Sequence, residues 1–264
     1  MFGYSRQGFY KHEVLLEKRS VQAREVIDIV NGIRAIMPRT GCRKMHGEVN
    51  RQLILRKIEP IGRDRFFEIL RERDLLIKRK RRTVFTTDSY HRFRTYKNRL
   101  KNAIITKPNQ AWVADITYLR IKNDFCYLFL LTDDYSRKIV GYNVSKDLSV
   151  MGAQKALKMA SKQANGAEAI IHHSDRGIQY CCDAYVKQMK KHKMQISMTE
   201  VNHCYENAKA ERVNGILKQE FYLNEVLPNY KSACKMVTEV IKIYNNNRWH
   251  QALNYMTPEA KHAA

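Results

Sequence analysis

Residues 112–120 read WVADITYLR, a stretch that combines the composition of a buried strand with a single acid. Aromatic and β-branched residues surround Asp115, which stands in the middle of the stretch. A carboxylate in such a strand is costly to bury unless a metal or another cation compensates its charge. Asp115 is therefore a candidate metal ligand, although an exposed or hydrogen-bonded strand acid is the alternative.

Two further acids stand where catalysis would need them. Asp175, in IIHHSDRGIQY (170–180), follows a short apolar strand, and α/β sheets place their sites at the carboxyl ends of strands. Glu211 lies in a helix expected over 207–221 and shares one face of it with Asn207 and Lys218. An acid between an amide and a cation suits metal binding beside a phosphate. A surface pair of Glu211 with a lysine is the alternative.

Four residues near these acids are expected to have structural roles. His172 and His173 adjoin Asp175, and a packed or hydrogen-bonded histidine is favoured over a contact with the site. Asp133 and Asp134 are interpreted as structural acids at the end of a strand.

The order of predicted elements around the acids indicates an α/β fold. Three strands are expected first, joined by a turn at 122–124, and helices then alternate with two short strands. Ser149 is expected to cap the first of these helices. The strands are predicted at 112–121, 126–133, 138–144, 169–173 and 196–199, and the helices at 149–163, 183–191, 207–221 and 231–247.

The first hundred residues have a different, helical and basic character. Helices are predicted over 14–36, 43–55 and 63–75, and they suggest a helix-turn-helix module, with a plain helical bundle as the alternative. The predicted organisation is a helical DNA-binding domain (1–75), a basic linker (76–104), an α/β core (105–225) and a C-terminal helix with an irregular tail (226–264). The linker opens with an uninterrupted run of cations: Lys78, Arg79, Lys80, Arg81 and Arg82.

The net charge of +22 points to a polyanionic partner, with nucleic acid as the default. Both parts of the chain contribute, because residues 1–100 hold 25 Lys and Arg against 11 Asp and Glu, and the remainder 23 against 15. No stretch approaches the ~18 apolar residues of a membrane span. The six cysteines show no CxxC pair or zinc-finger spacing, so reduced, packed thiols are expected.

The three acids and their surroundings resemble a known enzyme family. Between Asp115 and Asp175 lie 59 residues, and between Asp175 and Glu211 lie 35, which resembles the D,D(35)E signature of retroviral-type integrases and bacterial transposases. WVADITY (112–118), HSDRGIQY (173–180), AERVNGILKQE (210–220) and YNNNRWHQALNYMTPEA (244–260) are similar to motifs of the second reading-frame product (OrfB) of the IS-three family of insertion sequences. TGCRKM (40–45) resembles the helix-turn-helix region of that family. The resemblance covers nearly the whole chain, with mild departures at Thr40-Gly41 and in VNHCYENA (201–208).

The resemblance implies an RNase H-like catalytic core with a mixed five-stranded sheet. It assigns Asp115, Asp175 and Glu211 to two Mg²⁺ ions, for which Mn²⁺ could substitute. It further implies DNA strand cleavage and then attack of the freed 3′-OH on a target strand. Lys218 is expected to contact a DNA phosphate, and Asn207 to orient Glu211 or a metal-bound water at the DNA.

The implied partners are double-stranded DNA (element ends and target), further copies of the chain and a possible first-frame (OrfA) product. A bacterial cytoplasmic location at the nucleoid is expected, with no membrane. Two alternatives stand beside this interpretation: another RNase H-fold nuclease, and a non-catalytic DNA-binding regulator of transposition.

Overall fold

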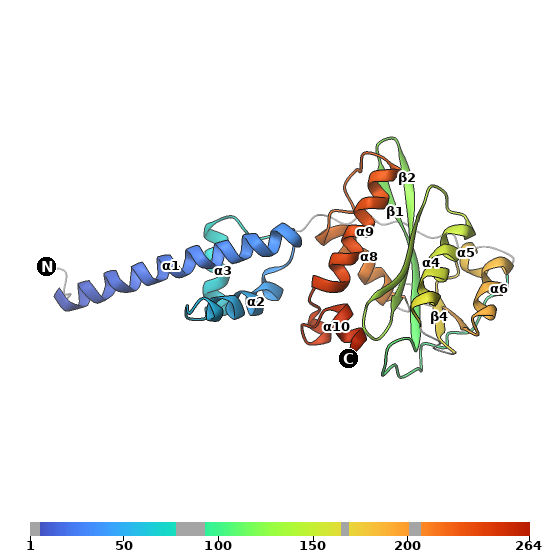
Figure 1. Ribbon diagram of the computed structural model, residues 1–264, viewed down its shortest axis with the longest axis horizontal. Coiled ribbons are helices and arrows are strands. Elements are labelled where there is room, and N and C mark those ends of the chain that lie inside the picture. Colours follow the sequence, from blue (N-terminus) through green and yellow to red (C-terminus); the bar gives the residue numbers. More distant parts are fainter. Residues whose placement is uncertain (1–5, 78–92, 165–168, 201–206) are drawn as a thin grey trace. The chain divides into compact units, whose positions relative to one another are not determined.

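The computed structural model, shown in Figure 1, describes residues 6–77, 93–164, 169–200 and 207–264. The chain divides into two compact units, Met1–Arg82 and Thr83–Ala264. The basic run 78–82 of the predicted linker lies outside the described residues. No described helix has both the length and the apolar character that a bilayer crossing requires.

The first unit contains three helices: α1 (Arg6–Ile36), α2 (Cys42–Leu55) and α3 (Arg63–Glu72). Their buried apolar faces form one small core, to which Val30, Leu53 and Phe66 contribute. Helix α1 begins eight residues before the predicted start at residue 14. Helix α3 ends three residues before the predicted end at residue 75, because Asp74 takes a left-handed conformation (φ 51°). The three predicted helices are otherwise confirmed.

A mixed five-stranded sheet forms the centre of the second unit, as predicted. Its strands are β1 (Ala111–Ile121), β2 (Asp124–Asp133), β3 (Ile139–Ser145), β4 (Ile171–Ser174) and β5 (Gln195–Met198), in the order β3-β2-β1-β4-β5. The pairs β1–β2 and β2–β3 are antiparallel, and β1–β4 and β4–β5 are parallel. Strand β4 begins two residues later than predicted, because Ala169 is left-handed (φ 58°).

Helices cover both faces of this sheet (Figure 1). On one face lie α4 (Val150–Gln163), α5 (Ile178–Cys181) and α6 (Asp183–Lys191), and on the other lie α8 (Ala208–Glu220) and α9 (Tyr230–Asn247). Successive side chains of β1 point to opposite faces of the sheet. Trp112 and Ala114 belong to the buried cluster under α4, so Val113 and the next odd-numbered residues point to the other face. Asp115 therefore belongs to the face that α8 covers.

Helix α4 lies very close to the sheet because glycines stand at the contact. A Cβ on Gly141 would come within 2.3 Å of the Ala156 carbonyl oxygen, and one on Gly152 within 2.3 Å of the Phe129 ring. Ser149 occupies the N-cap position of α4, as expected, but its side chain makes no capping hydrogen bond. The predicted cap is thus correct in position and wrong in mechanism.

The prediction of an irregular end over 248–264 is wrong. A 3₁₀ turn, η1 (Gln251–Leu253), is followed by helix α10 (Pro258–Ala263). Thr257 caps α10 by accepting a hydrogen bond from the Ala260 amide, and Pro258 takes the first helical position. The helix is tied to the sheet through its ion pair between Glu259 and Lys138 (2.8 Å).

Part of the segment predicted as a linker lies on the second unit. The amide of Asn98 donates to the Glu200 carboxylate (2.8 Å), and the amide of Arg99 donates to the Ser197 hydroxyl (2.9 Å). Tyr96 packs against the buried cluster under α4. Residues 96–99 thus run beside the end of β5.

Candidate active site

Strand β1 holds Asp115 against helix α8. Asn214 of α8 donates from Nδ2 to Asp115 Oδ2 at 2.6 Å, and the Ile116 amide donates to Oδ1 at 2.9 Å. The Asp115 side chain is half-buried. Both carboxylate oxygens therefore have a fixed donor, which orients the group in the layer between the sheet and α8.

The register of the sheet brings Asp175 beside Asp115. Strands β1 and β4 run parallel, and their paired positions end at Val113 and His173. Two residues beyond this pair along the chain stand Asp115, still within β1, and Asp175, the first residue after β4. The Gly177 amide donates to Asp175 Oδ1 (3.0 Å), and Arg176 Nε donates to the Thr199 carbonyl (2.7 Å), so the loop after β4 is held on both sides.

Helix α8 supplies the third acid, Glu211, from its exposed first turn. Desolvation first, then the charge of Asp175 and, to a smaller extent, that of Glu211 raise the pKa of Asp115 to about 7, although the hydrogen bonds from Asn214 and Ile116 lower it. Both other acids thus lie within electrostatic range of Asp115. The structure brings together the three acids that the sequence singled out.

The set fits a hard divalent cation by its chemistry. All three groups are carboxylates, the ligands that Mg²⁺ and Mn²⁺ prefer, and their mutual repulsion would be relieved by a bound cation. In the described residues, no three His, Cys, Asp or Glu side chains lie close enough together to hold one ion. The acids are neighbours through space in this arrangement and do not form a closed cage.

Asn207 and Lys218 lie on the same side of α8 as the acids. Asn207, at the start of the helix, is buried and donates from Nδ2 to the Ala114 carbonyl (3.3 Å) of β1. Desolvation lowers the pKa of Lys218, the Asp115 charge acts in the opposite direction, and Arg120 lowers it further. Lys218 is thus a half-buried cation in the electrostatic field of the site.

Asn214 is a site residue that the sequence interpretation missed. It lies three residues after Glu211 and four before Lys218, so it completes the stripe that begins at Asn207. That spacing was the available signal, but an asparagine within a helix carries no mark of its partner. Only the packing of α8 on β1 shows that it contacts Asp115.

The neighbouring histidines are hydrogen-bonded and buried, as predicted. Tyr185 Oη lies 2.8 Å from His172 Nε2, and Ser197 Oγ lies 2.8 Å from His173 Nδ1. Burial lowers the pKa of His172 to about 3, so this ring stays neutral in the core.

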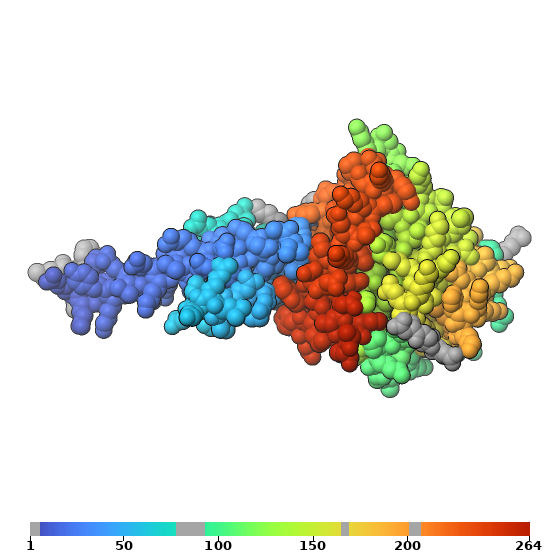
Figure 2. All heavy atoms as spheres, in the orientation of Figure 1, coloured from blue at the N-terminus to red at the C-terminus, as the bar shows by residue number. Residues whose placement is uncertain are grey.

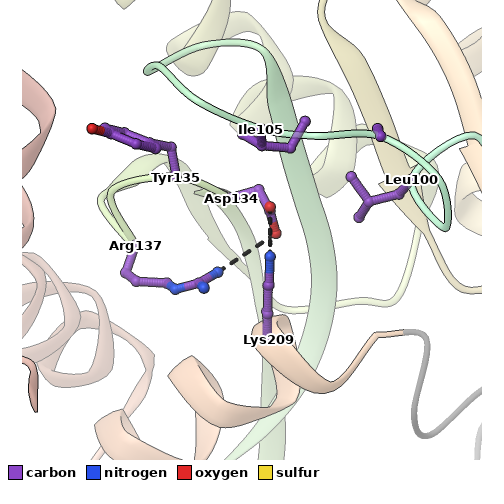
Figure 3. A pocket seen from close by; sticks show the side chains of 7 residues that line it. Leu100, Ile105, Asp134, Tyr135, Arg137 and Lys209 are labelled. Carbon is purple, nitrogen blue, oxygen red and sulfur yellow. Dashed lines mark hydrogen bonds and ion pairs between the residues drawn. The ribbon is translucent and has the colours of Figure 1, made fainter. Parts of the chain in front are cut away.

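Asp133 and Asp134 have the structural roles that were expected. Asp133 accepts hydrogen bonds from the Asn109 amide (2.8 Å) and the Ser136 amide (2.7 Å). Asp134 pairs with Lys209 of α8 (2.6 Å) and Arg137 (3.5 Å), across a polar pocket of about 210 Å³ (Figure 3). The ion pair with Lys209 anchors the first turn of α8 to the end of β2.

Comparisons with known proteins agree with this geometry. Residues 105–204 match a family described as "Integrase core domain", and residues 192–258 match a second family of the same description. A 31 kDa protein of insertion element IS600 from Shigella sonnei is 33% identical over 265 residues, which cover 98% of this chain and 95% of that protein.

One further relative and one solved structure are also similar to this chain. Transposase InsF for insertion sequence IS3A from Escherichia coli (strain K12) is 35% identical over 153 residues, 58% of this chain and 53% of InsF. A chain of the simian T-cell lymphotropic virus intasome aligns with a TM-score of 0.51 at 16% identity, over 85% of this chain and 75% of that chain. The chain therefore belongs to the IS3 family of insertion-sequence transposases, and its second unit has the RNase H-like fold of an integrase core.

Proposed function

We propose that this protein is the catalytic subunit of a DNA transposase, with Asp115, Asp175 and Glu211 as its catalytic acids. One observation carries the proposal: β1, the end of β4 and the first turn of α8 place three carboxylates within electrostatic range of one another. Three negative charges close together destabilise the folded protein when no cation is bound. Acids whose pKa is perturbed in this way are typical of functional sites.

The three acids would hold two Mg²⁺ ions, with Mn²⁺ as a substitute. When bound, the ions would stabilise charge on the attacking and leaving oxygens of an in-line displacement. Asn214 keeps Asp115 in a fixed orientation, and Asn207 ties the start of α8 to β1. Lys218 would pair with a DNA phosphate beside the scissile bond, since this half-buried cation lies within electrostatic range of Asp115.

The proposed reaction has two phosphoryl transfers. In the first, a water oxygen bonds to the scissile phosphorus, and the bond to the 3′ oxygen breaks, leaving a free 3′-OH. In the second, that 3′ oxygen bonds to a target phosphorus and displaces the target's own 3′ oxygen. The substrates would be the DNA ends of the element and the target duplex.

The remaining parts of the chain would bind DNA and assemble the complex. We infer a DNA-binding role for the helical domain (1–75) and for the basic run 78–82 in the linker (76–104). The core (105–225) and the C-terminal region (226–264) would carry the chemistry. Two DNA ends require a homo-oligomer, a first-frame product is a possible further partner, and the setting would be the nucleoid in a bacterial cytoplasm.

Charge-neutral substitutions of the acids test the assignment. Asp115→Asn, Asp175→Asn and Glu211→Gln should each lower strand cleavage and strand joining at least about 100-fold, since such metal stabilisation is worth several kcal/mol. The assay is cleavage and joining of labelled element-end duplexes with Mg²⁺. DNA affinity measured without metal should stay within about twofold, because phosphate contacts dominate it.

Asp183→Asn is the matched control, because this exposed acid begins α6 on the opposite face of the sheet. It should retain full activity. Ordinary cleavage by any of the three site variants would refute the assignment of that acid. Cleavage without joining of pre-cut ends in the unmodified protein would instead indicate a nuclease.

A further inference from the structure

A basic groove runs between α4 and α6, on the face of the sheet opposite the acids. Its volume is about 550 Å³, and its cations are Lys155, Lys158, Lys162 and Lys191, which together define the α4–α6 groove. All four lysines are exposed. Both helices reach the surface on the face of the molecule that Figure 2 shows.

Acids are scarce around this groove in the part of the chain that the structure describes, although the charges of Asp147 and Lys155 act on each other. No Asp or Glu lines it, and α4 carries three lysines and no acid over its whole length. The only acid within α6 is Asp183, in its first turn and outside the lining. Four cations held close together repel one another, and an anionic ligand with several charges would relieve that repulsion.

The spacing between the two helices is held by side-chain hydrogen bonds. Gln154 Nε2 donates to the Ala184 carbonyl (3.3 Å), and Gln188 Nε2 donates to the Gln154 carbonyl (3.0 Å). Beneath them, Gly152 lets α4 lie close to the Phe129 ring. The groove is therefore preformed, and a ligand would not have to order it.

We propose that the α4–α6 groove binds the phosphodiester backbone of duplex DNA, at a segment separate from the one held at the acids. The lysines of α4 follow at intervals of three and four residues, so they form one stripe on the helix. From Lys155 to Lys162 this stripe spans about 10 Å of helix axis, which matches about three nucleotides of one strand of a duplex.

The charge pattern favours DNA over a second copy of the chain, because two such grooves facing each other would bring eight lysines together. The sheet separates the groove from Asp115, so one straight duplex cannot occupy both places through the same surface. This inference rests on the proposed function for the identity of the polyanion. The groove would hold the flanking or target duplex while an element end lies at the acids.

The test compares two triple variants that remove the same charge. Lys155→Gln/Lys158→Gln/Lys162→Gln alters the groove, and Lys231→Gln/Lys235→Gln/Lys242→Gln alters exposed lysines of α9. Binding of a labelled 30-base-pair duplex is measured by anisotropy between 50 and 200 mM salt, without metal. The groove variant should bind about tenfold more weakly at 150 mM salt, and its plot of log Kd against log salt should be shallower by about 2–3.

If the two triple variants lose DNA affinity to the same extent, within twofold, the proposal is overturned. A direct readout is the acylation of lysines followed by mass spectrometry. DNA should protect Lys155, Lys158 and Lys162 in the unmodified protein. If DNA does not protect these lysines from acylation, the proposal is also overturned. If poly-glutamate protects them and DNA does not, the ligand is an acidic protein.

Failure of this inference can be told from failure of the proposed function. Affinity and protection are measured without metal and need no chemistry. Cleavage of a pre-bound element end should stay within about twofold in the groove variant, whereas joining to a separate target duplex should fall about tenfold. If joining by the groove variant falls no more than its cleavage does, the inference about the groove fails and the proposed function stands.

Discussion

At the residue scale, the site depends on one carboxyl group in an unfavourable position. Asp115 stands among Trp112, Val113 and Ala114, which are fully buried, and it faces two other acids. Its donors, Asn214 and Ile116, offset this cost only in part, since the pKa still lies near 7. A group held in that state contributes to function at the expense of stability.

In the unfolded chain the pKa of Asp115 is the ordinary value of 3.8, whereas in the folded protein it is raised to about 7. The stabilisation from the protonated group is therefore complete below pH 4 and is lost as the pH rises towards 7. In the metal-free protein, the free energy of unfolding should fall between pH 5 and 8 by about 1–3 kcal/mol more than in Asp115→Asn.

Urea unfolding in EDTA at several pH values measures this difference. Asp183→Asn, which changes an exposed acid, should follow the unmodified protein across the range. Parallel pH curves for the unmodified protein and Asp115→Asn would show that the burial and the neighbouring acids do not perturb this carboxyl group.

The residues that the sequence could identify are those with a fixed spacing. Asp115, Asp175 and Glu211 stand out because an acid in a strand, an acid at a strand end and an acid in a helix are separated by the intervals that are typical of one family. Asn214 could not be identified in this way, because its role depends on which side of α8 faces β1. That orientation is a property of packing, and the helical period shows only which residues share a stripe.

At the element scale, α8 connects the site to the rest of the core. Asn207 and Asn214 donate hydrogen bonds to β1, and Lys218 lies within electrostatic range of that strand, while Lys209 pairs with Asp134 at the end of β2. The helix is therefore attached to two strands at its first turn and to Asp115 in its middle. Its position determines where Glu211 lies relative to the other acids.

Asn214→Ala should weaken the site without unfolding the protein. It removes a hydrogen bond to a charged group, worth about 1.5–3 kcal/mol, and leaves the half-buried Asp115 with one donor fewer. Strand cleavage should fall about 10–100-fold, and the pKa of Asp115 should rise, because Asn214 lowers it. The measurement is the pH profile of cleavage, whose acidic limb should move to higher pH.

The control for this prediction is Arg212→Ala, an exposed position of the same helix. It should leave the acidic limb where it is, whatever its effect on DNA affinity. If Asn214→Ala lowers activity with an unchanged pH profile, its role is packing of α8 and not orientation of the carboxylate.

Short elements were the least predictable. Helix α5 has four residues and α10 has six, so neither shows a full hydrophobic period. Contacts distant in sequence help to hold both: Gln179 of α5 donates to the Leu148 carbonyl, and Glu259 of α10 accepts from Lys138, more than a hundred residues earlier. Helices α6 and α9 were predicted to within one residue because their apolar faces repeat, whereas the start of the much longer α1 was predicted eight residues too late.

At the scale of the whole molecule, the C-terminal motif is explained by packing of the second unit. Asn245 at the end of α9 exchanges two hydrogen bonds with the Ile139 backbone, both 3.0 Å. Arg248, which is 3% exposed, forms two 2.9 Å bonds with the Glu220 carboxylate at the end of α8. The motif that carried part of the family resemblance thus fastens α9 to the sheet and to α8.

The division of the chain into two units predicts which unit a substitution in this motif destabilises. Arg248→Lys keeps the charge but loses the paired geometry of the guanidinium, which should destabilise the second unit by about 2 kcal/mol. Because the first unit, Met1–Arg82, has its own core, its hydrogen exchange should not change. Exchange should accelerate in α8, α9 and the strands they cover.

Hydrogen-exchange mass spectrometry of the full chain separates these outcomes, with Arg63→Lys as the control. Arg63 pairs with Asp64 on the exposed start of α3, where a surface ion pair contributes little. That variant should leave exchange unchanged in both units. Faster exchange in α1–α3 of Arg248→Lys would mean that the two units unfold together and share one stability.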